Sequence, residues 1–194
     1  YGIQVPEELA NSHWSKRFIS WIEAIRMERA SGNITLKVYL EDLNNMRKII
    51  ADLTRNIRNL ANSEGYKETV RLLKTVPGIS TLTAMTLLTE LYDINRFRNL
   101  DKLCSYVGLI PDTHSSGQTE RKSGITSRRN GYLRGILIES AWVSVRKDPA
   151  MLVAFNVLCK KMPKNNAIVR IARKLLNRIR YVVKNQQEYV RSVI

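Results

Sequence analysis

The chain has 194 residues, of which 44% are hydrophobic and 25% charged, so it is long and apolar enough for one or two folded domains. Cys104 and Cys159 lack metal-type spacing, no signal peptide is visible, and no apolar run approaches the roughly 18–20 residues of a membrane span. We therefore expect reduced core cysteines in a cytoplasmic protein, with no disulfide framework and no membrane partner.

The net charge of +15 is uneven: residues 1–70 hold 10 basic and 9 acidic residues, whereas 71–194 hold 22 and 8. Such segregation favours a basic C-terminal part that binds a polyanion, with nucleic acid ahead of a merely solubilising surface.

Residues 1–32 are predicted to form an N-terminal helical segment. Ser12 is a candidate N-cap for a helix from about His13 to Ala30, and Ser31-Gly32-Asn33 is expected to break that helix. Its apolar face would carry Trp14, Phe18, Trp21, Ile22 and Ile25. Because these side chains recur at helical spacing among mixed charges, we expect core or interface residues rather than a surface that stacks on bases.

Residues 33–65 are predicted to form one long helix with a coiled-coil pattern. From Leu43 onward the apolar positions are separated by steps of 3, 4, 3, 4 and 3 residues, ending at Leu60. This heptad spacing is typical of a helix that pairs with another helix, and a helix packed on its own domain is the alternative. We favour pairing, and expect the 36–60 helix to assemble a homo-oligomer, either a dimer or a tetramer.

Residues 66–194 are predicted to form a compact helical domain that opens with a helix-hairpin-helix-like motif. A helix over 66–75, the turn Val76-Pro77-Gly78-Ile79-Ser80 and a second helix follow one another. Proline fixes φ at the entry to the turn, and the N-terminus of the second helix offers backbone N–H groups to a phosphate. Pro77, Gly78 and Ser80 are therefore candidate contacts to a DNA backbone, with a simple turn between packed helices as the alternative.

Four further helices are expected after this motif, and the first three have recognisable end signals. They are 100–107, N-capped by Asn99 and closed by Gly108; 130–146, starting at Asn130; 148–159, starting at Asp148-Pro149; and about 165–184.

The helix over about 165–184 carries basic side chains outside its apolar face and no acid. A basic amphipathic helix can lie on a membrane surface or on nucleic acid. Since it shares a chain with the helical hairpin, we prefer nucleic acid, with Arg170, Arg173 and Lys174 as candidate contacts. No segment alternates with a period of two residues for long, so the predicted fold class is all-α.

A stretch rich in glycine and arginine, residues 108–130, interrupts the helices and has almost no periodic apolar signal. We expect a functional loop without secondary structure. Glycine lets the backbone approach a ligand closely, and arginine binds phosphate through paired hydrogen bonds. The candidate phosphate-binding residues of this loop and of the helix after it are Gly117, Arg121, Lys122, Arg128, Arg129 and Arg134.

Three segments resemble a known family: VPGISTLTAMTLLTEL, FRNLDKLCSYVGLIP and HSSGQTERKSGITSRRNGYLRGILIESAW. In order and spacing they are similar to the C-terminal domain of the DEDD-type, bridge-RNA-guided insertion-sequence transposases of family one-ten, relatives of the Piv-like DNA invertases. The resemblance covers roughly residues 66–190, and the preceding heptad helix looks like that family's coiled coil. It implies a bacterial DNA transposase or recombinase that acts on the nucleoid, with DNA and a guide RNA as partners.

The resemblance also implies a catalytic residue. In that family the serine of the Ser-Gly step in this loop cuts DNA and holds it as a phosphoserine. Ser116 takes that place by motif position, whereas the residues alone leave Ser115 open, and His114 is either a base or merely exposed. Mg²⁺ is implied for an acidic N-terminal domain, and no cofactor is expected in this chain. The chain begins with Tyr1 rather than Met, so we expect a C-terminal fragment that is inactive alone.

These features together predict the serine-bearing, nucleic-acid-binding part of a transposase. The alternative is a non-catalytic helix-hairpin-helix module that binds DNA or RNA, and a helical protein of membrane surfaces is less favoured. No motif identifies the target sequence, the RNA or the number of protomers.

Overall fold

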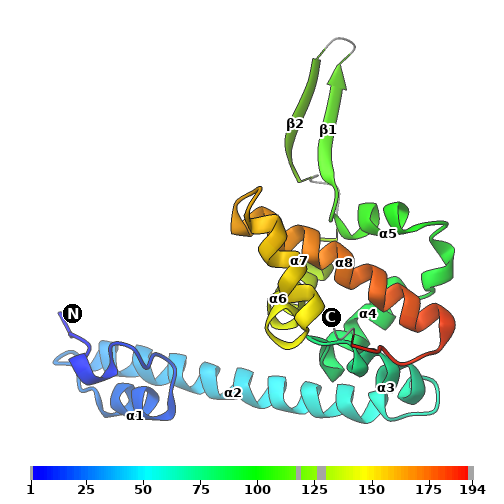
Figure 1. Cartoon of the computed structure of the whole chain (residues 1–194). Coiled ribbons are helices and arrows are strands. Elements are labelled where there is room, and N and C mark those ends of the chain that lie inside the picture. The colour runs from blue at the N-terminus through cyan, green and yellow to red at the C-terminus, as the bar shows by residue number, and fades with distance from the viewer. Residues whose placement is uncertain (1, 117–118, 126–129, 192–194) are drawn as a thin grey trace. The chain divides into compact units, whose positions relative to one another are not determined.

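The computed structural model describes residues 2–116, 119–125 and 130–191, and for 111–116 and 119–125 it describes the backbone. Figure 1 shows a helical chain, which confirms the predicted all-α class, with one short β-hairpin added. The chain divides into two compact units, residues 1–55 and 56–194, and the boundary falls inside one continuous helix, α2 (Ala30–Ala61). The predicted division at residues 32 and 65 remains a prediction.

The first unit is small and has a small core. A 3₁₀ turn, η1 (Glu7–Leu9), and helix α1 (Lys16–Ala24) precede α2. The buried residues Leu9, Phe18 and Ile19 pack together, with Trp21, Ile22 and Leu43 against them. Helix α1 is shorter than the helix predicted over 13–30, because Ser15 rather than Ser12 is its N-cap, accepting a hydrogen bond from Phe18 N at 3.2 Å.

The predicted helix break at Ser31-Gly32-Asn33 is wrong, because α2 begins at Ala30 and runs through these residues. The Asn33 side chain accepts from Met27 N and donates to Met27 O, both at 2.8 Å, so it fixes the turn that leads into the helix. A Cβ on Gly32 would lie 2.5 Å from Met27 Sδ. Glycine therefore makes room for the Met27 side chain, at the modest cost of about 1 kcal/mol that glycine carries inside a helix.

Helix α2 has an exposed apolar stripe at the heptad positions. Met46, Ile50 and Leu53 are each more than half exposed, and the same stripe continues through Ile57 and Leu60. These side chains therefore have little packing within a single copy of the chain. Pairing of this helix remains a prediction.

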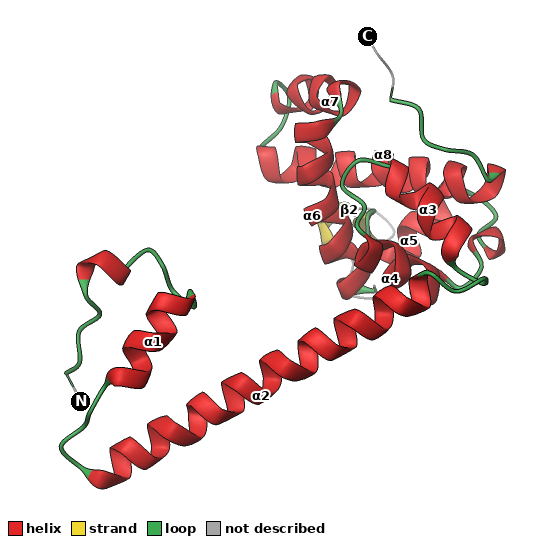
Figure 2. Ribbon diagram, turned by 90° about the horizontal axis from the view of Figure 1, so that it is seen from below, coloured by secondary structure: helices red, strands yellow, loops and turns green. Residues whose placement is uncertain are grey.

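The second unit is a helical bundle in which α8 packs against several of the other helices, and Figure 2 shows these helices in red. Helix α8 has eight buried residues and contacts α3, α5, α6 and α7. The fully buried side chains include Leu73, Leu103, Leu137 and Leu175, which come from four different helices. The helices of this unit after α2 are α3 (Lys67–Thr75), α4 (Thr81–Leu91), the 3₁₀ turn η2 (Ile94–Arg96), α5 (Leu100–Val107), α6 (Gly131–Lys147), α7 (Pro149–Cys159) and α8 (Lys164–Asn185).

The end signals predicted for these helices are confirmed. The Asn99 side chain accepts from Lys102 N at 3.0 Å, and the Asn130 side chain accepts from Leu133 N at 3.0 Å. Gly108 closes α5 with a φ of 81°, in the left-handed region that favours glycine. Asp148 N-caps α7, accepting from Ala150 N at 3.0 Å.

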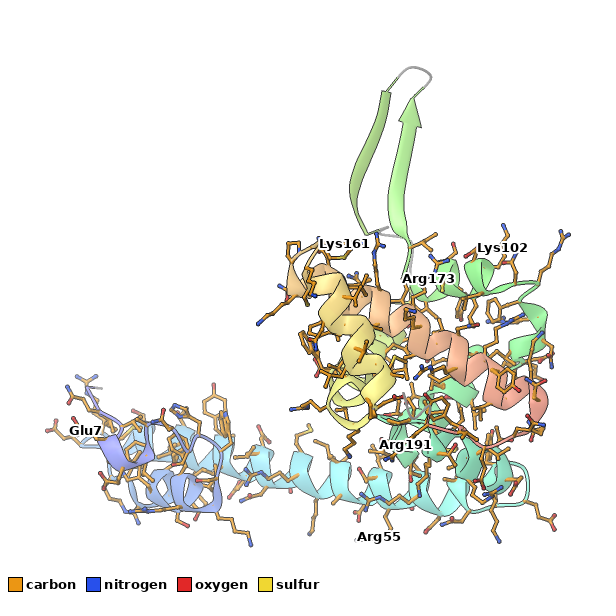
Figure 3. The ribbon with its side chains drawn as sticks, viewed as in Figure 1. Glu7, Arg55, Lys102, Lys161, Arg173 and Arg191 are labelled. Atoms are coloured by element: carbon orange, nitrogen blue, oxygen red, sulfur yellow. The ribbon has the colours of Figure 1, made fainter. Side chains whose placement is uncertain are left out.

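The loop predicted over 108–130 is corrected in part, because it contains a two-stranded antiparallel hairpin. Strand β1 (Pro111–Ser116) pairs with β2 (Thr119–Ile125), with a bulge between Pro111 and Asp112. An alternating apolar pattern is expected where one face of a sheet packs on a core. This hairpin instead projects from the helices, at the end of the unit where Lys102, Lys161 and Arg173 are labelled (Figure 1, Figure 3). Without a core to cover, its sequence needs no such pattern.

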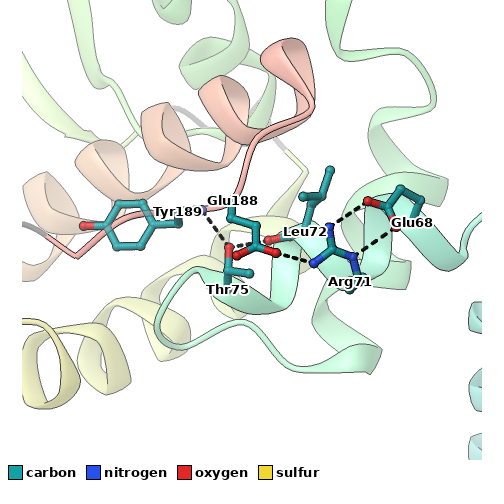
Figure 4. Close-up of polar contacts among 6 residues, drawn as sticks. All are labelled: Glu68, Arg71, Leu72, Thr75, Glu188 and Tyr189. Atoms are coloured by element: carbon teal, nitrogen blue, oxygen red, sulfur yellow. Dashed lines mark hydrogen bonds and ion pairs between the residues drawn. The ribbon is translucent and has the colours of Figure 1, made fainter.

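The C-terminal tail after α8 is bound to α3 (Figure 4). Tyr189 N donates to Thr75 Oγ1 at 2.8 Å, and Glu188 forms an ion pair with Arg71. The Tyr189 hydroxyl donates to the buried Asp148 carboxylate at 2.7 Å, which also accepts from Arg178 at 2.7 Å. One side chain therefore joins the tail to the start of α7.

The two acid–base groups of this contact have shifted pKa values. Burial alone would raise the pKa of Asp148, but the hydrogen bond from Tyr189 and the charge of Arg178 outweigh it, and the pKa lies below its ordinary value. Burial, and next the hydrogen bond to Asp148, raise the pKa of Tyr189 to about 12.

Both cysteines are free thiols, as predicted. Cys104 is fully buried in the main core, and its burial raises the pKa of the thiol to about 11. Cys159 is half-buried at the end of α7.

Candidate nucleic-acid interface

Three chain segments are bonded together where the hairpin leaves the helices. The Tyr106 hydroxyl donates to Glu90 O at 3.2 Å, at the end of α4. Asn130 N donates to Tyr106 O at 3.2 Å, and the Asn130 side chain donates to Glu90 Oε2 at 2.6 Å. The ends of α4 and α5 and the start of α6 therefore form one junction, here called the hairpin base and defined by Glu90, Tyr106 and Asn130.

An arginine is stacked on the same tyrosine. The Arg96 guanidinium lies 4.7 Å from the ring centre of Phe97 and 4.9 Å from that of Tyr106, and the two rings lie 5.3 Å apart. Such contacts restrict a side chain that is otherwise free to rotate, and they leave the guanidinium edge available for a phosphate. No acid pairs with Arg96 in the part of the chain that the structure describes.

The hairpin carries the predicted nucleophile near its tip. Ser116 is the last residue of β1 and pairs with Thr119, and Ser115 pairs with Glu120. Further toward the hairpin base, His114 lies opposite Arg121 and Thr113 opposite Lys122. The structure therefore brings Ser116, Arg121 and Lys122 into one ribbon. The other predicted residues of this stretch, Gly117, Arg128 and Arg129, lie outside the described residues.

The predicted helix-hairpin-helix turn lies at the opposite end of α4 from the hairpin base. Helix α4 has 11 residues, so its two ends are about 16 Å apart. Pro77 is buried, and Ser80 is exposed and N-caps α4 through Thr83 N at 3.1 Å. Gly78 has a φ of 93°, and a Cβ there would collide with Ser140 O of α6. Close packing on α6 thus accounts for this glycine, and its phosphate contact remains a prediction.

A shallow groove of about 530 Å³ runs from this turn along α6. Ser80 and Thr83 line one part of it, and Gly131, Tyr132 and Gly135 line the part near the start of α6. A Cβ added to either of these two glycines would meet nothing within 4 Å, so the groove is open there.

The predicted basic residues of α8 do not all face solvent. Arg170 and Lys174 are exposed, whereas Arg173 is half-buried and forms an ion pair with Asp101 of α5. Arg134, on α6, is also half-buried. Arg170 and Lys174 are therefore the α8 candidates with the freer side chains.

Sequence reasoning missed the contacts in and beside the hairpin base. It assigned no element to the stretch around Arg96, although Ile94 and Phe97 are buried, at 5% and 8% exposed. Two apolar residues three apart were a signal for a short ordered turn. No sequence signal joined Tyr106 to Glu90, because that contact links the ends of two separate helices.

The described ranges offer neither a cluster of metal ligands nor a membrane-spanning helix. No group of three or more His, Cys, Asp or Glu side chains there could hold a metal ion, so those residues do not fit a Mg²⁺ site. None of the helices described there is both long and apolar enough to cross a membrane.

Comparison with known proteins gives one family. Residues 70–155, which include the hairpin and its base, match the model described as Transposase IS116/IS110/IS902 family. The chain is 27% identical over 190 residues to the transposase for insertion sequence element IS1111A of Coxiella burnetii, covering 93% of this chain and 51% of that protein. It is 33% identical over 173 residues to the pilin gene-inverting protein of Moraxella bovis, covering 84% and 52%. A third relative, the transposase for insertion sequence element IS1328 of Yersinia enterocolitica, is 33% identical over 90 residues, covering 46% and 27%. The chain spans about half the length of these relatives or less.

Proposed function

Because this chain belongs to the IS116/IS110/IS902 transposase family, we propose that it is the DNA-binding and strand-cleaving part of a transposase or recombinase. The observation that supports this most is the hairpin. It extends Ser116 away from the helical body, on a ribbon that also carries Arg121 and Lys122 (Figure 1). Such a ribbon can reach a DNA backbone that the packed helices cannot.

The proposed step is a transfer of one phosphodiester bond. The Ser116 hydroxyl oxygen attacks phosphorus, an Oγ–P bond forms, and the P–O bond to the leaving deoxyribose oxygen breaks. The serine proton passes to a base, and the leaving oxygen takes up a proton. Arginine and lysine side chains beside the phosphate stabilise the charge that develops on its oxygens. The phosphoserine retains the bond energy that rejoining to a second strand needs.

The partners of this reaction are also proposals. Duplex DNA is the substrate, a guide RNA selects the site, and copies of the chain pair through the stripe on α2. We propose that Mg²⁺ is held by an acidic N-terminal domain, as the family resemblance implies. We place the reaction on the bacterial nucleoid.

A second function is favoured by another observation. The exposed Arg170 and Lys174 and the basic composition of 71–194 would suffice for a module that binds nucleic acid without cutting it. This module and the proposed transposase differ in whether Ser116 becomes bonded to DNA.

The test is Ser116→Ala in the full-length protein with its RNA. Binding comes from many dispersed contacts, so we expect duplex affinity to stay within about twofold, while strand exchange falls by at least about 1,000-fold for lack of a nucleophile. The protein–DNA adduct is trapped on a denaturing gel and mapped by mass spectrometry. Ser115→Ala is the matched control and should keep the adduct. An adduct that persists without Ser116, or cleavage without any adduct, would refute the assignment.

A further inference from the structure

A tyrosine with unusual backbone geometry lies beside the hairpin base. Tyr92, directly after α4, has φ 56° and ψ −82°, a combination that side-chain-bearing residues rarely adopt. Its side chain is 89% exposed. A backbone in such a conformation destabilises the fold, and it persists only where the surrounding structure holds it. Packing does not explain this residue, because almost none of its ring is covered.

Contacts with the hairpin base restrain the chain on both sides of Tyr92. Two residues before it, Glu90 is bonded through its carbonyl to Tyr106 and through its carboxylate to Asn130. Four residues after it, Arg96 is stacked on the Tyr106 ring. The chain between these two anchors contains the turn η2, whose start is fixed by Asp93 accepting from Asn95 N at 2.8 Å. The fold therefore keeps an exposed aromatic ring and a restrained guanidinium a few residues apart.

The nearby acids are already engaged by the fold. The Glu90 carboxylate accepts from Asn130, the Asp93 carboxylate from Asn95 N, and Asp101 pairs with Arg173. Arg96, Arg98 and Lys102 are exposed on the same segment. The three carboxylates keep their charges, and the four cations of this region, which are Arg96, Arg98, Lys102 and Arg173, outnumber them by one. The small excess of positive charge favours a phosphate at Arg96.

We propose that Tyr92 and Arg96 form a platform for single-stranded DNA, in which an unstacked base lies on the Tyr92 ring and its phosphate on Arg96. Exposed aromatic rings next to cations bind single strands in this way, because every base has a face on which an aromatic ring can stack. A second exposed ring, Tyr132 at 66%, follows Asn130 at the start of α6 and lines the open groove. It would take the next unstacked base.

The inference rests on the proposed function, because the strand held here would be the one opened beside Ser116. A duplex whose strands part at the hairpin exposes bases, and an aromatic surface at the hairpin base would keep them from pairing again. The proposed function needs binding of duplex DNA and a covalent serine. The platform adds a preference for an unpaired strand, which can be measured separately.

The test compares Tyr92→Gly with the unchanged 194-residue chain on a single-stranded DNA that contains one 2-aminopurine, and on the matching duplex. Glycine tolerates the φ of 56°, so we expect the midpoint of thermal unfolding to stay the same or rise. We expect affinity for the single strand to fall about tenfold and the fluorescence change of 2-aminopurine to disappear, with duplex affinity unchanged. If Tyr92 served only to stabilise the fold, Tyr92→Gly would not weaken binding of the single strand while keeping or raising the midpoint of thermal unfolding.

Two control variants make the result specific. Tyr92→Phe keeps the ring and should bind as the original chain does. Tyr181→Ala removes another exposed tyrosine, 57% exposed on α8, and should have no effect. If Tyr92→Gly binds the single strand as well as before while the duplex is still bound, the platform is refuted and the proposed function stands. If the unchanged chain binds neither the single strand nor the duplex, the platform and the proposed function are both refuted. If RNA of the same sequence binds more tightly than the single-stranded DNA, DNA is refuted as the occupant of the platform.

Discussion

At the scale of single residues, the second unit depends on a few polar contacts between distant parts of the chain. Asp148 caps α7 with one carboxylate oxygen and accepts from Arg178 and Tyr189 with the other. Its side chain is buried, so each of its partners replaces a water molecule that an exposed carboxylate would bind. Buried carboxylates that are fully hydrogen-bonded make stability depend on pH.

Asp148→Asn should lower the free energy of unfolding at neutral pH by roughly 1–3 kcal/mol, because Arg178 loses its charged partner and the cap weakens. The folded pKa of Asp148 lies below the unfolded value of about 3.9. Its contribution is therefore complete above the unfolded pKa and is lost as pH falls through the folded pKa. Urea unfolding of both proteins between pH 7 and pH 3 measures this. Equal losses on acidification in the two proteins would show that Asp148 is not responsible.

The hydrogen bond between Tyr189 and Asp148 also makes the free energy of unfolding fall as pH rises in the alkaline range. The folded pKa of Tyr189 is raised to about 12, so its contribution is complete below the unfolded pKa and is lost as pH rises through about 12. Tyr189→Phe should remove this alkaline loss while leaving the ring in place, and urea unfolding at rising alkaline pH measures the difference.

At the scale of elements, sequence reasoning succeeded where a local signal decides the structure. The N-caps Asn99, Asn130 and Asp148 act on residues two or three positions away, so the sequence is sufficient to find them. It failed at Gly32, where Met27 fills the space left by the missing side chain, and at residues 108–130, where backbone pairing between two strands needs no apolar pattern. For the candidate site, Ser116 was assigned from the family resemblance and stays a prediction. Tyr92 and Tyr106 were not found, because their positions depend on contacts between helices that no local pattern encodes.

The exposed stripe on α2 gives a prediction for that element. Ile50→Asp together with Leu53→Asp places two charges where a paired helix would bury apolar side chains. We expect light scattering to show a smaller species with unchanged helix content by circular dichroism. Asn45→Asp with Lys48→Asp changes exposed polar residues of the same helix and should leave the mass unchanged. If the first variant also keeps its mass, the stripe does not pair copies of the chain.

At the scale of the whole molecule, the positive charge of the chain attracts a nucleic acid before any specific contact forms. Residues 71–194 hold 22 basic and 8 acidic residues, and half of the basic ones lie in α8, η2, α5 and the hairpin. Such a surface binds duplex DNA by displacing the ions around its phosphates, and the binding weakens steeply with salt.

Because of this charge, the purified 194-residue chain should bind duplex DNA. It should not cut the DNA, because the metal is proposed to be held elsewhere. Replacing the exposed Arg170 and Lys174 by Ala should reduce the slope of log affinity against log salt by about 0.9 for each phosphate that is no longer bound. Titrations at several salt concentrations give the slope, and incubation with Mg²⁺ tests for cutting. Metal-dependent cleavage by this chain would contradict the proposal that the metal is held elsewhere.

The bond between Tyr189 and Thr75 also sets an order of events during synthesis. The two residues are 114 positions apart, and α8, whose buried face forms part of the core, lies between them and directly before Tyr189. At ribosomal speeds of about 5–20 residues per second, Tyr189 is synthesised on the order of 10 s after Thr75. Until then the apolar faces of α3 to α7 lack the helix that covers them. A nascent chain of this protein should therefore depend on chaperones until residues 164–189 have emerged from the ribosome.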